Sequence, residues 1–263
     1  MEILAYISAI FVGVVLGLLG GGGSILTVPV LVYLMQIPAY QSTGYSLFVV
    51  GITSLIGSFN YMKQKLVDFK VAVIFSIPSF IGVLLTRKLV LPALPDALFT
   101  INSFSVTKNM LIMVLFSVLM LLASYSMIKK SNSAKEEKEQ NKIYLIFKFF
   151  MVGVFLGLVG AGGGFLIIPS LIFFAKLEMK QAVGTSLLII SVNSIIGFLG
   201  DLTTSLEIDW TLILTFTVLS IFGIFIGTYI SKFIDGKKLK PAFGWFVLVM
   251  GIYIIAKELF LKL

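Results

Sequence analysis

The feature that most constrains the fold is a series of long apolar segments separated by short polar loops. A helix needs about 20 apolar residues to cross a hydrocarbon core of about 30 Å. Six segments meet that length and two exceed it: 43–62, 70–90, 109–128, 182–200, 210–231 and 243–261, and the longer 3–36 and 143–175. Because 59% of the chain is hydrophobic and only 12% is charged, it lacks the polar surface that a water-soluble domain needs. The sequence predicts an all-α integral membrane protein.

The charged residues and the missing residue types exclude several classes of function. Basic residues lie at the ends of the apolar segments, where they anchor spans to lipid headgroups, so the net charge of +8 does not indicate nucleic acid. The chain has no Cys and no His, which removes thiol nucleophiles and the usual zinc ligands. No acidic pair lies within the spans. We expect no catalytic residue, no metal and no cofactor, and the apolar start without basic residues is not typical of a cleaved signal peptide.

The chain contains an internal repeat. Residues 17–29 (GLLGGGGSILTVP) recur 140 positions later at 157–169 (GLVGAGGGFLIIP). The register persists through later matched pairs: Gln41/Gln181, Gly44/Gly184, Ser46/Ser186, Leu47/Leu187 and, after one inserted residue, Asp68/Asp209 and Gly82/Gly223. Repeats of this kind fix the architecture. The sequence predicts a first membrane repeat at 1–130, a cytoplasmic connector at 131–142 and a second membrane repeat at 143–263.

Each repeat begins with an apolar segment that is too long for one crossing. Residues 3–36 would measure about 51 Å as a single helix. Glycine costs about 1 kcal/mol per residue in a helix interior, so the helix is expected to break at Gly20–Gly23 (the first break) and at residues 160–164 (the second break). Each repeat is therefore predicted to be a glycine-broken helical hairpin followed by three transmembrane helices. The pattern does not decide whether the hairpins re-enter or cross fully.

Loop charges indicate how the repeats are oriented. Residues 63–70 carry three Lys, whereas the matching loop at 201–209 carries three acidic residues and no basic one. Lys and Arg favour the cytoplasmic side, so the two loops are expected on opposite sides and the repeats are predicted to be inverted. The Lys-rich segments 129–148 and 231–240 then lie in the cytoplasm. Residues 87–108 depart from the rule, because their basic residues would lie outside.

The two breaks are the predicted substrate site. In transporters with inverted repeats, such sites lie near the midplane at broken helices, and the start of a half-helix presents free N–H groups that favour an anion. The predicted ligands are Gly22, Gly23 and Ser24 in the first repeat and Gly162, Gly163 and Gly164 in the second. The alternative for these glycines is close helix packing, which the GxxxG pairs Gly13/Gly17 and Gly153/Gly157 are expected to provide.

Polar residues follow each hairpin at matched positions. Hydroxyl and amide groups donate to anionic oxygens without carrying a fixed charge, and they equally hold membrane helices together. The predicted substrate path includes Gln41 and Ser46, and Gln181, Thr185 and Ser186.

Ionisable residues are nearly absent from the span centres. Asp68, Asp201 and Asp209 lie at span edges, where they are expected to cap helices, and Arg87 is expected to snorkel to the interface. No carboxylate relay for protons is visible. If transport is coupled to protons, the proton travels with the substrate or uses an acid at a span edge. The oligomeric state is not encoded in these patterns.

The motifs of both halves are similar to those of a known family. In the first half they are residues 17–29, Gln41-Ser42-Thr43-Gly44-Tyr45-Ser46, Gly57 and Val67-Asp68, and in the second GAGGGFLIIP, Ala182-Val183-Gly184-Thr185-Ser186 and Ile208-Asp209-Trp210. They resemble the TauE/SafE family of sulfite and organosulfonate exporters over nearly the whole chain. Tyr45 stands where the second half has Thr185, and Ser24 stands where it has Gly164.

The resemblance implies a secondary transporter, in the exporting direction, for small sulfur-containing anions such as sulfite, thiosulfate or organosulfonates. It implies a multi-pass protein of the bacterial inner (cytoplasmic) membrane, with the anion and the lipid bilayer as its partners. A permease for a carboxylate or another small anionic metabolite, and an anion channel, are the alternatives on the same scaffold.

Overall fold

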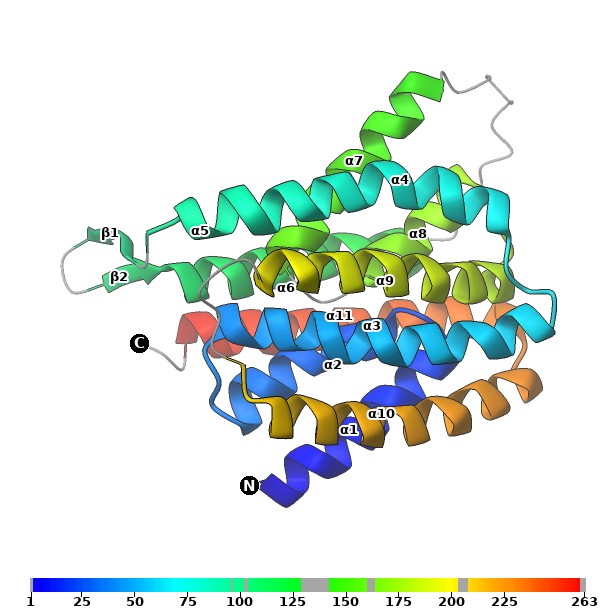
Figure 1. The fold of residues 1–263 in the computed structure, drawn as a ribbon, viewed down its shortest axis with the longest axis horizontal. Helices are drawn as coiled ribbons and strands as arrows, with labels where there is room; N and C mark the ends of the chain where they lie inside the picture. Colours follow the sequence, from blue (N-terminus) through cyan, green and yellow to red (C-terminus); the bar gives the residue numbers. More distant parts are fainter. Residues whose placement is uncertain are drawn as a thin grey trace.

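The computed structural model describes residues 2–95, 97–101, 104–128, 142–159, 164–202 and 208–260. The first repeat contains α1 (Glu2–Leu19), α2 (Gly22–Pro29), η1 (Val30–Leu34), α3 (Ala39–Lys63), α4 (Phe69–Leu85), η2 (Thr86–Val90), α5 (Leu91–Ala93), β1 (Ala97–Ile101), β2 (Phe104–Thr107) and α6 (Lys108–Ile128) (Figure 1). The second contains α7 (Lys142–Val159), α8 (Gly164–Phe174), α9 (Met179–Leu202), α10 (Trp210–Ile230), η3 (Ser231–Phe233) and α11 (Gly236–Phe260). The predicted connector at 131–142 lies outside the described residues, except for Lys142.

The helical membrane fold is confirmed. Each half has two short helices at the predicted break, followed by three long ones. Within the described ranges, six helices are long and apolar enough to cross a membrane: Ala39–Lys63, Phe69–Ala93, Lys108–Ile128, Met179–Leu202, Trp210–Phe233 and Lys238–Glu258. A short antiparallel hairpin, β1–β2, pairs Ala97 with Thr107 and Ile101 with Phe104. The apolar pattern did not predict this hairpin, which is too short to alter the helical architecture.

The matched long helices run in opposite directions along the bundle (Figure 1). At one end, the N–H of Asp68, just before α4, donates to Thr185 Oγ1 near the start of α9, at 2.9 Å. At the other end, the N–H of Asp209, just before α10, donates to the Tyr45 hydroxyl near the start of α3, also at 2.9 Å. Tyr45 and Thr185 are matched positions, so both accept the same hydrogen bond from the opposite half. This antiparallel relation is what the predicted inverted repeats require.

The two halves interleave through glycine faces. Gly13 of α1 lies against the backbone of Ser220 in α10, and its mate Gly153 of α7 lies against the backbone of Ser79 in α4. Gly17 and Gly157 continue the two contacts one turn further on. Backbones approach this closely only where no Cβ intervenes. The packing role predicted for both GxxxG pairs is therefore confirmed.

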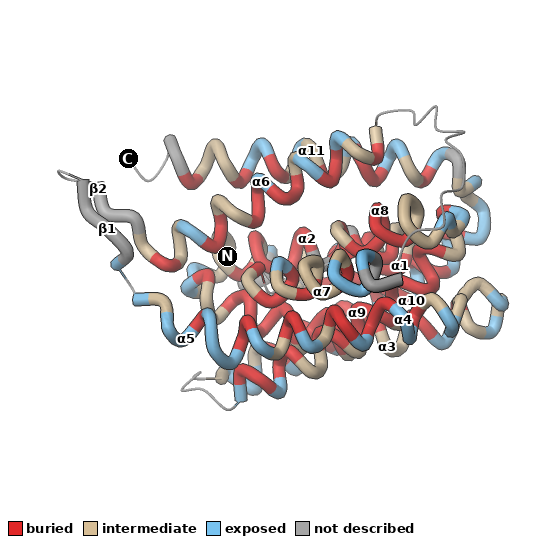
Figure 2. Tube along the Cα trace, turned by 90° about the horizontal axis from the view of Figure 1, so that it is seen from above, coloured by how far each residue is buried: buried red, intermediate tan, exposed pale blue. Residues whose placement is uncertain are grey.

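The outer face of the bundle is apolar and the interior is closely packed. Large apolar side chains such as Leu122, Phe222 and Val249 are exposed on α6, α10 and α11, where lipid would contact them. Figure 2 shows buried residues concentrated on α3, α9 and the short helices α2 and α8. The short helices therefore lie inside the bundle, and Gly20 and Gly21 of the first break are buried with them.

Candidate functional site

The first break is a sharp reversal at Gly20 and Gly21. Gly20 has a φ of +70°, a backbone conformation that favours glycine, and its N–H closes the last turn of α1 on Leu16 O at 2.8 Å. The chain then folds back, so that a Cβ on Gly23 would lie 2.5 Å from Val12 O and 3.0 Å from the Leu16 Cα. The predicted hairpin is thus present in the first repeat, and the missing side chain of Gly23 allows its two arms to touch.

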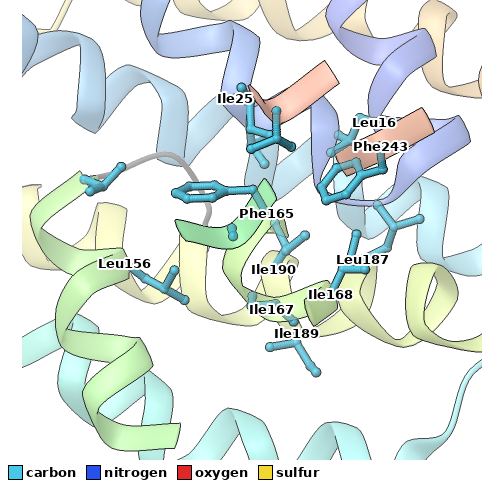
Figure 3. Close-up of a cluster of buried hydrophobic side chains, with 14 of the residues drawn as sticks. Leu16, Ile25, Leu156, Phe165, Ile167, Ile168, Leu187, Ile189, Ile190 and Phe243 are labelled. Carbon is cyan, nitrogen blue, oxygen red and sulfur yellow. The ribbon is translucent and has the colours of Figure 1, made fainter. Parts of the chain in front are cut away.

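The two breaks meet in the centre of the molecule. Gly21, which precedes α2, is in backbone contact with Gly164, the first residue of α8. Figure 3 shows Ile25 of α2 and Phe165 of α8 in the same buried cluster. Both half-helices therefore begin at one central place, as the anion-site hypothesis requires. Gly162 and Gly163 lie outside the described residues.

The residue that precedes α2 has no side chain with which to cap it. Its N-cap is Gly21, which makes no side-chain hydrogen bond to the helix, so the N–H groups at the start of α2 are not capped from that position. Gly22 is the first residue of α2 and Gly164 the first of α8. Helix N-termini of this kind bind anions through N–H groups and the helix dipole.

A tyrosine caps the carbonyl end of the helix that enters the first break. The hydroxyl of Tyr61, which is fully buried in α3, donates to Gly17 O at 2.8 Å and lies 2.9 Å from Ser231 Oγ. Beside it, Asn60 Nδ2 donates to Thr228 Oγ1 at 3.1 Å. Neutral groups thus satisfy the carbonyl end of α1, and α3, α10 and η3 are joined to it.

Tyr61→Phe is expected to lower the free energy of unfolding by about 1–3 kcal/mol, because the buried Gly17 carbonyl loses its side-chain donor. Thermal unfolding of the purified protein in detergent would measure the effect. Tyr229→Phe removes a hydroxyl from a side chain that is 61% exposed and is the matched control. Equal stability of the two variants would contradict a capping role for Tyr61.

The helices next to the breaks contain buried polar atoms without partners. Among the described residues, no hydrogen bond is made by the hydroxyls of Ser46, Thr53 and Ser54 in α3, or by Ser194 Oγ and Asn193 Oδ1 in α9. Thr53/Asn193 and Ser54/Ser194 are matched positions, and α3 packs along α9. Unsatisfied buried polar groups are rare and call for water, an ion or a ligand. Thr53, Ser54, Asn193 and Ser194 were not among the predicted site residues, although their matched spacing was visible in the sequence.

The predicted polar residues fall into different places. Ser186 Oγ donates to Val183 O and lies beside Gly20, where a Cβ would approach it to 2.7 Å. Its mate Ser46 is buried, and its hydroxyl has no partner within the described ranges. Thr185 is buried and accepts from Asp68, Gln41 and Gln181 are partly exposed near the starts of α3 and α9, and the side chain of Ser24 lies outside the described part of the chain. The structure thus places Ser186 at the first break, whereas Gln41 and Gln181 lie toward opposite ends.

Two cavities occupy corresponding positions at opposite ends of the bundle. One, of about 360 Å³, lies where α3 and α6 begin and is lined by Pro38, Tyr40, Gln41, Thr107, Lys108 and Asn109. The other, of about 630 Å³, lies where α9 and α11 begin and is lined by Glu178, Met179, Lys180, Asp235, Gly236 and Lys240. Residues 178–180 are the repeat mates of 38–40. Each cavity contains lysine. In the larger one Lys180 and Lys240 stand with Glu178 and Asp235, so its lining carries no net charge, and in the smaller one the buried Lys108 lies over the Tyr40 ring.

A buried ion pair lies where η2 packs between the ends of α7 and α9, and the sequence-based expectation for it was wrong. Arg87 Nη1 is 3.0 Å from Asp201 Oδ2, with side-chain exposures of 0% and 1%. Arg87 therefore does not snorkel, because Asp201, from the far end of α9, provides a partner inside the protein. Asp68 and Asp209 do cap helices, accepting from Val71 N and Leu212 N as expected. In the repeat, Thr228 is the mate of Arg87 and Tyr61 is the mate of Asp201. Charged residues therefore stand in one half where the other half has neutral ones, and this difference was the sequence signal that could have revealed the ion pair.

Comparison with known proteins gives relatives over nearly the full length. The chain is 28% identical over 252 residues to a "Probable membrane transporter protein" of Xylella fastidiosa, covering 93% of this chain and 91% of the relative. It is 26% identical to "Probable membrane transporter protein YunE" of Bacillus subtilis, with 98% of each chain covered. It is 27% identical to "Probable membrane transporter protein MJ0441" of Methanocaldococcus jannaschii, with 94% of each covered.

No solved structure matches the chain. The family model described as "Sulfite exporter TauE/SafE" matches residues 5–254, which include both repeats, both breaks and both cavities. The agreement with the expected family extends from α1 into α11. The chain therefore belongs to the TauE/SafE family and is a multi-pass membrane transporter of a small molecule.

Proposed function

We propose that this transporter carries a small sulfur-containing anion, such as sulfite, thiosulfate or an organosulfonate, out across the cytoplasmic membrane. The anion binds at the two glycine breaks and is exposed alternately to the two end cavities. The ligands are the backbone N–H groups of Gly22, Gly23 and Ser24 and of Gly162, Gly163 and Gly164. The side chains of Gln41, Ser46, Gln181, Thr185 and Ser186 line its path.

The observation that carries this proposal is the contact between Gly21 and Gly164. It brings the N-termini of α2 and α8 to one enclosed place, where two helix dipoles favour negative charge. Inverted repeats with such broken helices bind substrates near the midplane. The hydroxyls of Ser46, Ser54 and Ser194, for which the described segments offer no partner, add donors without adding a fixed negative charge.

The two cavities supply routes from opposite sides of the membrane. Residues 231–240 are predicted to be cytoplasmic and 87–108 to lie outside, so the cavity beside Lys240 would open to the cytoplasm and the cavity beside Lys108 to the outside. The family description favours a sulfur oxyanion and the exporting direction. Direction in a secondary transporter follows the gradients of substrate and coupling ion, and the sequence shows no proton relay.

The experiment is a thermal-stability series on the purified protein in detergent with sulfite, thiosulfate, sulfate, sulfoacetate, taurine, acetate and chloride. A ligand that binds only the folded state at 100 times its Kd adds about 2.7 kcal/mol of stability. We expect a selective rise with a sulfur oxyanion or sulfonate. A rise with acetate alone would indicate the carboxylate permease, and no rise with any anion would contradict the proposed substrate class.

Flux through reconstituted vesicles then separates a transporter from a channel. A transporter that alternates between two cavities gives saturable flux, which unlabelled substrate on the far side accelerates. A channel gives flux without such stimulation. We expect counter-substrate stimulation for the anion that raised the thermal stability.

A further inference from the structure

The fully buried arginine that follows α4 has donors without an acceptor in the part of the chain that the structure describes. Arg87 donates through Nη1 to Asp201, whereas Nε and Nη2 have no acceptor among the described residues. An intramembrane charge is costly and is by default a sign of function. Unused donors on such a side chain add to that cost.

The geometry of the unused donors matches a particular class of ligand. Nε–H and the outward Nη2–H lie on one edge of the planar guanidinium, where they form two parallel hydrogen bonds to an oxyanion. Nη1, at the other side, holds the aspartate. Arg87 can therefore bind an oxyanion and keep its counter-ion at the same time.

The repeat supplies an internal comparison. At the equivalent place in the other half, Thr228 and Tyr61 stand in the positions of Arg87 and Asp201, and all their described contacts are made by neutral groups. The two sites pack alike: Gly157 lies against Thr86 and Val83, and Gly17 lies against the matching Gly227 and Ile224. The fold thus needs no charge at this position, so helix capping alone does not account for Arg87.

The local structure places Arg87 beside the end of α7, the helix that leads to the second break. It lies in η2, a π-helical turn that continues α4, and π-helical turns occur often at functional sites. The preceding residue, Thr86, packs on Gly157 three residues before the break begins, and its buried hydroxyl also has no partner among the described residues. Gly200, next to Asp201, lies close to the arginine, since a Cβ added at Gly200 would meet the Arg87 Cβ at 3.5 Å, an ordinary contact distance.

We propose that Arg87 is a substrate-binding residue that holds the oxyanion through its Nε–Nη2 edge, with Asp201 as its fixed counter-ion. This inference rests on the proposed anion transport. It makes the site asymmetric, because the one buried guanidinium in the described part of the chain lies on the side of the second repeat's break. Arg87 is enclosed in this state. An anion reaches it only when the packing of α4 against α7 and α9 opens, as alternating access requires.

The test compares anion affinity in three purified full-length proteins: wild type, Arg87→Gln/Asp201→Asn, and Arg87→Lys. The double variant replaces the ion pair with a neutral hydrogen-bonded pair of similar size, so it leaves no unpaired buried charge. Affinities for sulfite, thiosulfate, methanesulfonate and acetate are measured by thermal shift, and gel filtration checks folding. We expect the double variant to bind roughly 100-fold more weakly, and Arg87→Lys, which loses the two-pronged edge, on the order of 10-fold more weakly.

Tyr61→Phe is the control, because it alters the equivalent position of the other repeat and should keep wild-type affinity. If the double variant and Arg87→Lys bind as tightly as wild type, Arg87 is not a ligand, while the proposed transport function stands. If the wild type itself binds none of the four anions, both proposals fail. Should the double variant not fold, Arg87→Lys decides, since it keeps the charge and the partner, and undiminished affinity in it overturns the two-pronged contact.

Discussion

Gly153→Ala should destabilise the protein by about 3 kcal/mol or more, at the upper end of the effects of overpacking. A Cβ on Gly153 would overlap the backbone oxygen of Ser79 and lie 2.7 Å from its Cα. Neither atom belongs to a flexible side chain, so α7 must move away from α4 as a whole. The measurement is thermal unfolding in detergent, where a loss of this size lowers the apparent Tm by roughly 6–12 °C.

Gly236→Ala makes the same chemical change where there is room. A Cβ there would lie 3.5 Å from Lys180 Cγ and from Met179 Cβ, an ordinary contact distance, so the variant should unfold like the wild type. Comparable losses in both variants would mean that glycine-to-alanine exchange acts generally and not through the contact between α7 and α4. A normal Tm for Gly153→Ala would contradict the close packing itself.

Asp201→Ala is expected to destabilise the protein by about 3–5 kcal/mol, because it leaves Arg87 buried in the interior without its counter-ion. Both side chains are almost fully buried, so water cannot replace the lost carboxylate. Chemical or thermal unfolding at neutral pH measures the loss. A saturating oxyanion should restore part of the stability if it binds the unused edge of the guanidinium.

Asp209→Ala is the matched control from the other end of the same loop. Asp209 is exposed and accepts one hydrogen bond from Leu212 N as an N-cap, so its loss should cost only about 1 kcal/mol. If the two alanine variants lose the same stability, the buried pair contributes no more than a cap. The comparison thus isolates the cost of an unpaired interior charge.

Much of the architecture was predictable because it is local in the sequence. Glycine clusters interrupt a helix wherever they occur, and the 140-residue repeat shows that the same interruption was used twice. The glycine pairs Gly13/Gly17 and Gly153/Gly157 specify close packing by their spacing alone. The aspartates at 68 and 209 precede apolar helices, so their capping role also follows from sequence position.

The parts that were not predictable depend on contacts between distant segments. Arg87 near a span end looks the same whether it reaches the headgroups or a partner, and its partner Asp201 lies 114 residues away. Thr185 resembles a substrate ligand by motif, yet one of its lone pairs accepts from Asp68, which only the antiparallel meeting of the halves makes possible. The inverted topology and the anion ligands stay predictions, supported by helix direction and by the meeting of the breaks.

The interleaving of the halves has a consequence for how the chain is made. The partner of α1 is α10, so the glycine face of α1 lacks this partner until residues 210–230 leave the ribosome. At typical synthesis rates of about 5–20 residues per second, that interval lasts roughly 10–40 s. During this interval, α1 rests in lipid or against the insertion machinery, and Gly13 and Gly17 lack their contacts with α10. Biogenesis of this transporter therefore requires that the nascent α1 be kept from wrong partners until α10 has been inserted.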